Sequence, residues 1–150
     1  MPACLVDTNI WVALAFEAHP AHDLAAESFA QLTSAEPALF CRSTEQSFLR
    51  LATTPRMLKH YGADAVTNEQ ALDTLRHFQS HPAVAFRPEP AGLVPVWHRL
   101  AGLSSASPKV WMDAYLAAFA ITGGLRMLTL DGDFKSFVPE GLDLLLLELP

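Results

Sequence analysis

The sequence predicts an α/β fold, a three-layer α/β/α sandwich with a central parallel sheet. Three observations support it: short apolar runs alternate with longer amphipathic stretches, no internal repeat or linker divides the 150 residues, and 51% of the residues are hydrophobic while only 17% are charged. Parallel strands need crossover connections, which the intervening helices supply. A composition of this kind argues against disorder. The chain is therefore expected to form one domain over residues 1–150.

The first part of the chain contains two predicted strands and the helices around them. Ala3–Val6 is apolar and is followed by Asp7, the pattern of a buried strand whose carboxyl end presents a polar side chain. Ser43 and Gln46 have capping-box spacing, so a helix is expected to begin there with Glu45 in its first turn. The other elements expected here are helices over Ile10–Phe16 and Pro20–Leu32 and a strand over Ala38–Cys41.

The second part continues the alternation of strands and helices. Thr67 and Gln70 repeat the capping-box spacing ahead of a helix that reaches about Ser80. Ser107-Pro108 supplies an N-cap and a proline at the first helical position, and Gly123-Gly124 ends that helix. This part is also expected to contain strands over Ala83–Phe86, Met127–Leu130 and Leu142–Leu149, and a helix over Leu93–Leu103.

Four acidic residues are the candidate functional groups. Asp7 follows the first strand, Glu45 opens the helix after the second, and Asp131 follows the fourth. All three belong to the edge of the sheet where parallel α/β folds bind ligands. Asp113 lies in a helix among apolar residues, where a carboxylate needs a partner. Converging carboxylates repel each other unless a cation neutralises them, and carboxylate and water oxygens suit Mg²⁺ or Mn²⁺.

Each acid also has a purely structural interpretation. Asp7 could be the N-cap of the next helix, Glu45 could favour a helix dipole, and Asp131-Gly132 could be an ordinary turn. Asp113 is the hardest to explain in this way, because a mid-helix aspartate is disfavoured by propensity and by desolvation.

A carboxylate-held divalent ion suits the hydrolysis of phosphodiester bonds, because it lowers the pKa of the attacking water and stabilises charge on the reacting oxygens. The sequence has no Gly-x-Ser-x-Gly nucleophile motif and no glycine-rich phosphate loop, which disfavours covalent, triphosphate and dinucleotide chemistry. The sequence has no Cys-x₂-Cys pair, and its six histidines are expected to be surface or packing residues.

Four segments resemble the motifs of the PIN-domain family, and of its VapC-type toxins in particular. They are Val6-Asp7-Thr8-Asn9, Thr44-Glu45, Asp113-Ala114-Tyr115-Leu116-Ala117-Ala118 and Leu128-Thr129-Leu130-Asp131-Gly132-Asp133-Phe134. The resemblance extends over the whole chain and implies a single PIN domain over residues 1–150 with the α/β/α fold. It also implies a Mg²⁺- or Mn²⁺-dependent endoribonuclease, the toxin of a bacterial type II toxin–antitoxin system. Such a toxin is expected to be a homodimer that a small VapB-like antitoxin restrains.

The resemblance further assigns roles to individual residues. Asp7 and Asp113 would be the principal metal ligands, with Glu45 and Asp131 completing the pocket and holding metal-bound water. The residues expected to orient these acids are Asn9 and Thr129.

Asp133 lies close enough to Asp131 in the sequence to reach the same pocket. We favour Asp131 as the site residue, because it directly follows the strand and has the matching Thr129 two residues before it. Asp133 is instead expected to cap the short turn at Phe134.

The net charge of −6 argues against binding nucleic acid by bulk electrostatics, and residues 1–41 contain no Lys or Arg. RNA would therefore be held locally, by the metal and by basic side chains near the motifs. Arg50 is the candidate RNA contact, and the others, expected to be solvated, are Arg42, Arg56, Lys59 and Lys109. Trp11 and Trp111 could stack on bases, but core packing is the preferred interpretation for both.

Cys4 and Cys41 are expected to be free buried thiols in a reducing cytoplasm, and neither a signal peptide nor a membrane span is expected. Two alternatives to the RNA-cleaving toxin stay open. One is a structure-specific DNA nuclease that uses the same acids. The other is a non-catalytic PIN-like binding module in which the acids serve as helix caps and in salt bridges.

Overall fold

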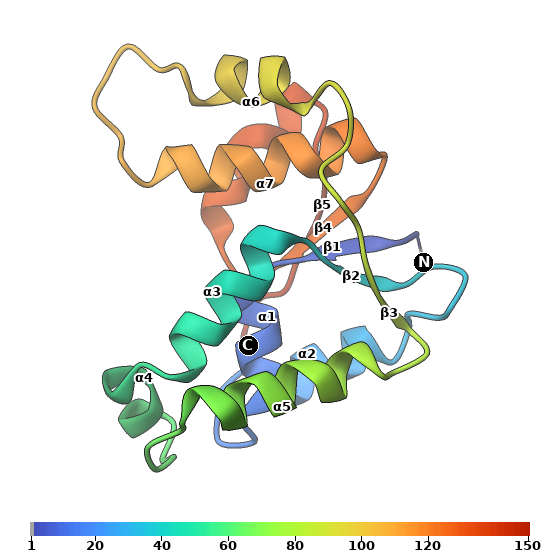
Figure 1. Cartoon of the computed structure of the whole chain (residues 1–150). Coiled ribbons are helices and arrows are strands. Elements are labelled where there is room, and N and C mark those ends of the chain that lie inside the picture. The colour runs from blue at the N-terminus through green and yellow to red at the C-terminus, as the bar shows by residue number, and fades with distance from the viewer. Residues whose placement is uncertain (1) are drawn as a thin grey trace.

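A five-stranded parallel β-sheet lies between two layers of helices in the computed structural model, which describes residues 2–150 (Figure 1). The strands run in the order β3-β2-β1-β4-β5, and every neighbouring pair is parallel. This confirms the predicted fold class. The strands are β1 (Cys4–Val6), β2 (Ala38–Phe40), β3 (Val84–Phe86), β4 (Arg126–Thr129) and β5 (Asp143–Leu146).

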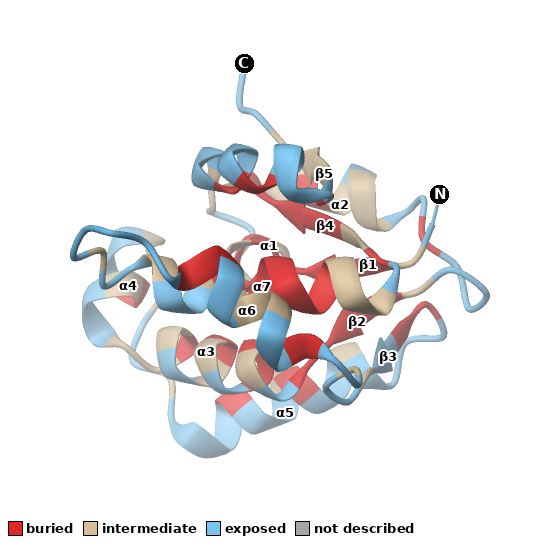
Figure 2. Cartoon of the chain, turned by 90° about the horizontal axis from the view of Figure 1, so that it is seen from above, coloured by how far each residue is buried: buried red, intermediate tan, exposed pale blue. Residues whose placement is uncertain are grey.

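The helices cover both faces of the sheet. One layer contains α1 (Thr8–Ala15), α2 (His22–Phe29), α3 (Arg42–Ala52) and α5 (Asn68–Gln79), with α4 (Pro55–His60) extending from α3. The other layer contains α6 (Leu93–Ala101), α7 (Val110–Gly123) and the 3₁₀ helix η1 (Gly132–Glu140). The central strands β1, β2 and β4 and the middle of α7 are buried, whereas the edge strands β3 and β5 are partly exposed (Figure 2).

The side chains of β1 point alternately into two hydrophobic cores, one on each face of the sheet. Cys4 and Val6 belong to the core under α1 and α3, whereas Leu5 belongs to the core under α6 and α7. This is the two-residue period of a strand buried on both faces. Trp11 is fully buried in the first core and stacks on Phe40 with ring centroids 3.8 Å apart. Core packing of Trp11 is thus confirmed, and the residue after β1 is held by rigid elements on both sides.

Helix α3 begins earlier than predicted. Its N-cap is Cys41, the residue directly after β2, and not Ser43. The hydroxyl of Thr44 accepts a hydrogen bond from the Cys41 backbone N–H at 3.0 Å and donates one to the Cys41 carbonyl at 3.1 Å. These hydrogen bonds cap α3 directly after β2. The capping-box spacing of Ser43 and Gln46 therefore does not set the residue at which α3 begins.

Other boundaries also differ from the prediction, among them those of α2 and α6, which are shorter than expected. Helix α1 begins at Thr8, because Asp7 caps it, and regular α7 begins only at Val110, after a turn from Ser107. Strand β5 stops at Leu146, because its partner β4 ends at Thr129.

Two predicted helix-end signals are confirmed. Thr67 and Gln70 form a reciprocal capping box at the start of α5. Gly124 ends α7 with a φ of 65°, a left-handed conformation that glycine adopts without strain. Among residues 2–150, no helix combines the length and the apolar character needed to cross a membrane.

Candidate active site

The site lies at the carboxyl ends of β1 and β4, which are neighbours at the middle of the sheet. Chain connections leave this point toward opposite edges of the sheet, since β2 lies beyond β1 and β5 lies beyond β4. Such a switch point is where open parallel sheets bind ligands. Asp7 follows β1 and Asp131 closely follows β4, so the topology brings these two predicted residues together.

Asp7 is 8% exposed, and its carboxylate accepts three hydrogen bonds. One oxygen accepts from the Thr8 backbone N–H at 2.8 Å, which makes Asp7 the N-cap of α1. The other accepts from the Thr129 hydroxyl at 2.7 Å and from the Asn9 side-chain amide at 3.3 Å. The structural interpretation of Asp7 is therefore correct, and it leaves the same carboxylate at the wall of a pocket.

The Thr129 hydroxyl connects the ends of the two strands. It donates to Asp7 and accepts from the Asp131 backbone N–H at 3.0 Å and from the Asn9 amide at 3.3 Å. Asn9 also accepts from the Leu130 backbone N–H at 3.2 Å through its side-chain oxygen. Thr129 is fully buried, so the sequence prediction that Asn9 and Thr129 contact the acids agrees with the geometry.

Burial raises the pKa of Asp7 from 3.8 to about 6. The hydrogen bonds from Thr129 and Thr8 act against this increase, whereas the nearby charges of Asp113 and Asp131 add to it. An ionised Asp7 is therefore unfavourable in the folded chain unless a cation lies beside it.

Replacing Asp7 with Asn is expected to stabilise the metal-free protein at neutral pH. Because the folded pKa is higher than the unfolded one, the free energy of unfolding of the wild type falls as pH rises from about 4 to above 6. Asn does not titrate and still caps α1. We therefore expect Asp7→Asn to raise the free energy of unfolding by about 2 kcal/mol at pH 8 and to change it little below pH 4. Urea unfolding at both pH values in EDTA tests this. Asp73→Asn, on the exposed face of α5, is the control, and equal pH dependence in all three proteins would contradict the prediction.

Asp113, Asp131 and Asp133 form an acidic group at the start of α7 and η1. Each places a carboxylate oxygen within 4.8 Å of the others. Burial and the charges of Asp131 and Asp133 raise the pKa of Asp113, and the adjacent Lys109 lowers it. The Lys109 ammonium lies 2.5 Å from Asp133, 3.0 Å from Asp131 and 3.7 Å from Asp113. These contacts raise the pKa of Lys109, so a permanent cation sits among the three acids.

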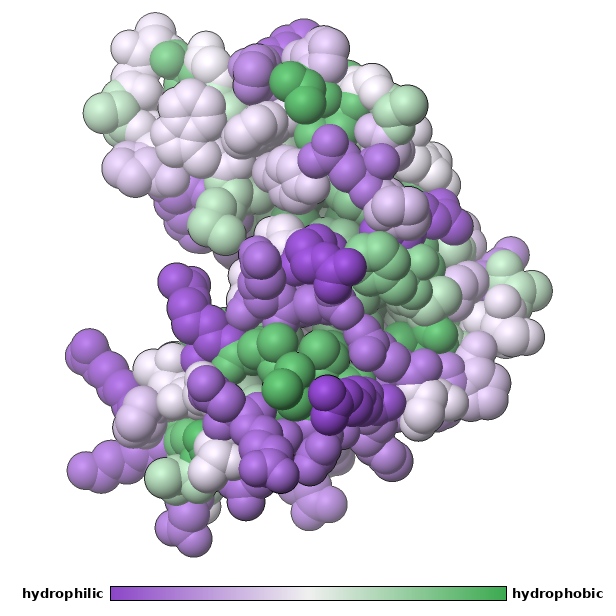
Figure 3. Space-filling view, in the orientation of Figure 1, coloured by the Kyte–Doolittle hydropathy of each residue, from purple (hydrophilic) through white to green (hydrophobic). Residues whose placement is uncertain are grey.

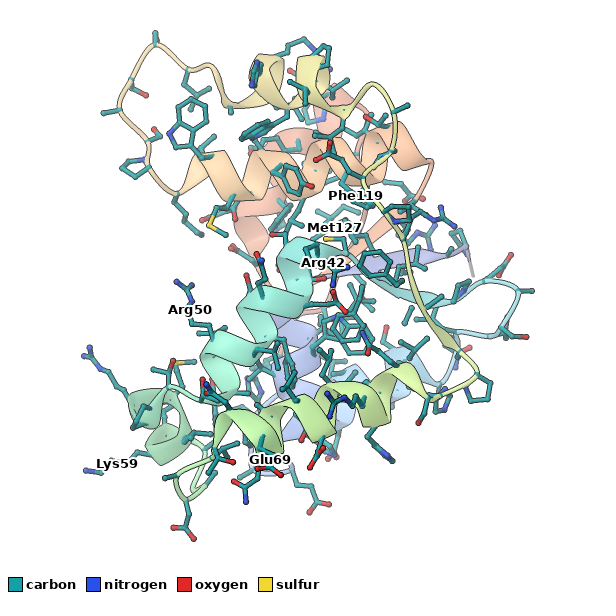
Figure 4. The ribbon with its side chains drawn as sticks, in the orientation of Figure 1. Arg42, Arg50, Lys59, Glu69, Phe119 and Met127 are labelled. Carbon is teal, nitrogen blue, oxygen red and sulfur yellow. The ribbon has the colours of Figure 1, made fainter. Side chains whose placement is uncertain are left out.

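Asp7, Asp113 and Asp131 line one pocket of about 370 Å³, here called the carboxylate pocket. Lys109 and Arg50 also line it, and Ser43 and Ser47 complete the wall on α3. Figure 3 shows a hollow on the side of the molecule between the layer with α7 and the layer with α3 and α4. In Figure 4, Arg50 projects from α3 toward the side where α7 begins. The structure therefore joins Arg50 to three of the four predicted acids.

Glu45 is not brought into the carboxylate pocket. Its side chain is buried, but its two oxygens accept hydrogen bonds from Arg42 at 2.6 Å and from Gln79 of α5 at 2.5 Å. Ser43, Ser47 and Arg50 share the pocket face of α3, and Glu45 lies two positions from Ser43 and Ser47, on another face. The Glu45 carboxylate therefore belongs to a separate set of contacts with Arg42 and Gln79.

Three further sequence interpretations need correction. Asp131, and not Asp133, caps η1, because its carboxylate accepts from the Asp133 backbone N–H at 2.9 Å. Lys109 is not simply solvated, since it pairs with the acidic group. Trp111 is 53% exposed and does not belong to the core. The ion pairs of Lys109 and the position of the pocket serines were not predicted, although the spacing of Ser43, Ser47 and Arg50 is that of one helix face.

Comparison with known proteins places this geometry in a family. A family model described as the PIN domain matches residues 4–138. The chain belongs to the PIN-domain family. It is 41% identical over 145 residues to ribonuclease VapC41 of two Mycobacterium tuberculosis strains, and the match covers 95% of this chain and 97% of that protein. A VapC ribonuclease is thus a homologue of this chain.

Two solved structures share the PIN fold with this chain. VapBC2 from Rickettsia felis, bound to a DNA fragment from its promoter, has a TM-score of 0.63 and 16% identity over 97% of this chain and 98% of that chain. VapC20 from Mycobacterium tuberculosis, a toxin that cleaves the sarcin–ricin loop, has a TM-score of 0.61 and 19% identity over 93% and 96% of the two chains. At these identities the comparison confirms the fold of the PIN domain.

Proposed function

We propose that this chain is a VapC-type ribonuclease toxin that hydrolyses RNA in the carboxylate pocket with the help of Mg²⁺ or Mn²⁺. The relationship to ribonuclease VapC41, at 41% identity over nearly the full length, supports the activity on RNA. The single observation that carries the position of the site is the convergence of Asp7, Asp113 and Asp131 on one pocket at the switch point of the sheet.

The donor groups in this pocket fit a hard divalent cation. They are carboxylate oxygens, the ligands that Mg²⁺ and Mn²⁺ prefer. The raised pKa values of Asp7 and Asp113 arise from burial and mutual repulsion, which a bound cation would relieve. Lys109 shows that the acidic group accepts a positive charge at this position. We therefore propose Asp7, Asp113 and Asp131 as the metal-holding residues, with Asp133 at the rim.

The remaining residues position the reacting groups. When bound, a divalent ion supplies a water of lowered pKa and neutralises charge on the phosphate. Thr129 and Asn9 fix the orientation of the Asp7 carboxylate through hydrogen bonds of 2.7 and 3.3 Å. Arg50 lies on the pocket wall, where its guanidinium can bind a phosphate beside the cleaved bond. Lys109, released from the acids by a metal, would offer a second positive charge to the RNA backbone.

We further propose that the chain forms a homodimer and binds a small VapB-like antitoxin in the cytoplasm. The Rickettsia felis neighbour was solved as VapBC2, which supports a partner of this kind. An apolar groove between α3 and α5, lined by Leu49, Ala71 and Leu72 beside Arg50, offers a surface for a helix of such a partner. Figure 3 shows apolar side chains gathered at the surface between these two helices.

Manganese titration tests the metal site and separates it from a non-catalytic module. An ion that binds only the folded state stabilises it, so a hundredfold excess over Kd is expected to raise Tm by about 5 °C or more. The Asp7→Asn variant should lose most of this shift, and Asp73→Asn should keep it. Digestion of single-stranded RNA and of branched DNA with Mn²⁺ then identifies the substrate. A missing thermal shift would contradict the metal site, and cleavage of DNA alone would contradict the RNA substrate.

A further inference from the structure

A second cleft, of about 530 Å³, adjoins the carboxylate pocket at the turn after β4. Leu130 and Gly132, the two neighbours of Asp131, form part of its wall. Gly132 also lines a third depression, whose wall shares Lys109 and Asp113 with the carboxylate pocket, so this depression lies between the two sites. A Cβ atom built on Gly132 would meet no atom within 4 Å, which leaves the surface over the turn open.

Aromatic and histidine rings also line this cleft. Tyr61, at the end of α4, packs against His19 of the turn before α2, with ring centroids 4.7 Å apart and planes inclined by 33°. His60 contacts the same Tyr61 ring edge to face at 5.6 Å. His60 is exposed, and His19 and Tyr61 are half-buried. We call this space, lined by His19, His60, Tyr61, Leu130, Gly132 and Glu148 among others, the ring cleft.

The charge of the ring cleft differs from that of the carboxylate pocket. Neither Lys nor Arg lines it, and its one carboxylate is that of Glu148. Burial and the neighbouring His22 lower the pKa of His19, so this ring is largely neutral at pH 7. The Glu148 carboxylate pairs with Lys135 at 3.5 Å, so these two charges offset each other, whereas Arg50 and Lys109 offer two positive charges in the carboxylate pocket. The ring cleft therefore suits the flat, uncharged part of a nucleotide.

We propose that the ring cleft receives one unpaired nucleobase of the RNA substrate, next to the phosphodiester that is cleaved at the carboxylate pocket. Single-stranded RNA is commonly recognised by splayed bases that stack on aromatic and histidine rings. Here His60 is exposed, whereas His19 and Tyr61, whose ring also stacks on Phe16, are half-buried. The inference rests on the proposed cleavage of RNA at Asp7, Asp113 and Asp131. The turn that carries Asp131 also forms part of the wall of the ring cleft. Tyr61 and His19 would then set which unpaired position of an RNA lies over the metal site.

The variants are chosen to remove a ring and keep the fold. His19→Asn retains a side-chain acceptor for the Ala21 backbone N–H, which now donates to the His19 ring at 3.0 Å. Tyr61→Leu keeps an apolar side chain against the core that Tyr61 contacts. His77→Asn, on the exposed surface of α5, is the matched control. All three are made in an Asp7→Asn background, so that binding of a labelled single-stranded RNA can be measured without cleavage.

Removing one stacked ring is expected to weaken RNA binding about fivefold to a hundredfold, and the control should not change it. RNAs in which one nucleotide at a time is made abasic locate the base. One abasic position should weaken binding to the parent protein and have little further effect on His19→Asn or Tyr61→Leu, because base and ring act as a pair. Sequencing the ends produced by otherwise wild-type proteins should show that both variants relax the preference at that position.

The outcomes separate this proposal from the function on which it rests. If RNA is cleaved by the wild type and both ring variants bind every abasic RNA as the control does, the ring cleft is not a base site and the proposal is overturned. The same result together with weaker binding of an antitoxin would assign the cleft to a protein partner. If the wild type cleaves no RNA, the proposed function itself fails. Thermal unfolding of each variant shows whether a loss of binding reflects a loss of folding.

Discussion

Replacing Asp113 with Asn is expected to reduce RNA cleavage by on the order of a thousandfold. Metal stabilisation of the charge that develops on a reacting phosphate is worth several kcal/mol, and each 1.4 kcal/mol corresponds to about a factor of ten in rate. Asn keeps the size of the side chain but removes the negative charge that would hold the ion. The rate is measured as initial cleavage of a labelled single-stranded RNA at saturating Mn²⁺.

Folding must be preserved for this result to be informative. Asp113 is mostly buried, with 18% of its side chain exposed, and its nearest cation is the mobile end of Lys109 at 3.7 Å. Neutralising it therefore leaves no buried charge without a partner, and the Tm should stay within a few degrees of the wild type. Asp73→Asn, which loses only an exposed pair with Arg76, should keep full activity. A fully active Asp113→Asn enzyme would exclude Asp113 as a metal ligand.

Replacing Thr129 with Val is expected to lower activity or metal affinity by about tenfold to a hundredfold, although Thr129 is not itself a proposed ligand. Val has nearly the same shape, but it cannot donate to Asp7 or accept from the Asp131 backbone N–H. Both carboxylates then lose the group that fixes their relative position. Because the hydrogen bond from Thr129 lowers the pKa of Asp7, its loss should raise that pKa further.

The measurement for Thr129→Val is the Mn²⁺ concentration that gives half-maximal cleavage, together with the maximal rate. A role in orienting the acids predicts a higher half-maximal concentration. Thr74→Val is the control, because the Thr74 hydroxyl is exposed and bonds only to the Gln70 carbonyl at 3.1 Å. Equal Mn²⁺ dependence in both variants would indicate that Thr129 contributes packing alone.

The residues at the ends of strands could be predicted from the sequence, because their positions follow from topology. An apolar run followed by an acid places that acid at the ligand-binding edge of a parallel sheet, as it does for Asp7 and Asp131. Asp113 could be identified because a carboxylate inside an apolar helix demands a partner. These inferences depend on local patterns and one general rule of the fold.

The direction in which the Glu45 side chain points could not be predicted in the same way. It depends on where α3 begins, which is set by hydrogen bonds between Cys41 and Thr44, and on Gln79, a partner 34 residues away on α5. The ion pairs of Lys109 with Asp131 and Asp133 could not be predicted either, because they form only when α7 and η1 meet. The exposure of Trp111 is also set by tertiary packing, which the local apolar pattern does not reveal.

The hydrogen bond between Asp7 and Thr129 joins residues 122 positions apart in the chain. Asp7 is therefore synthesised well before the strand β4 that carries Thr129. A nascent or prematurely terminated chain that stops before β4 has neither the hydroxyl that orients Asp7 nor Asp131. Fragments that lack β4 should therefore be harmless to RNA, and the ability to cleave it arises only after β4 and Asp131 have been made.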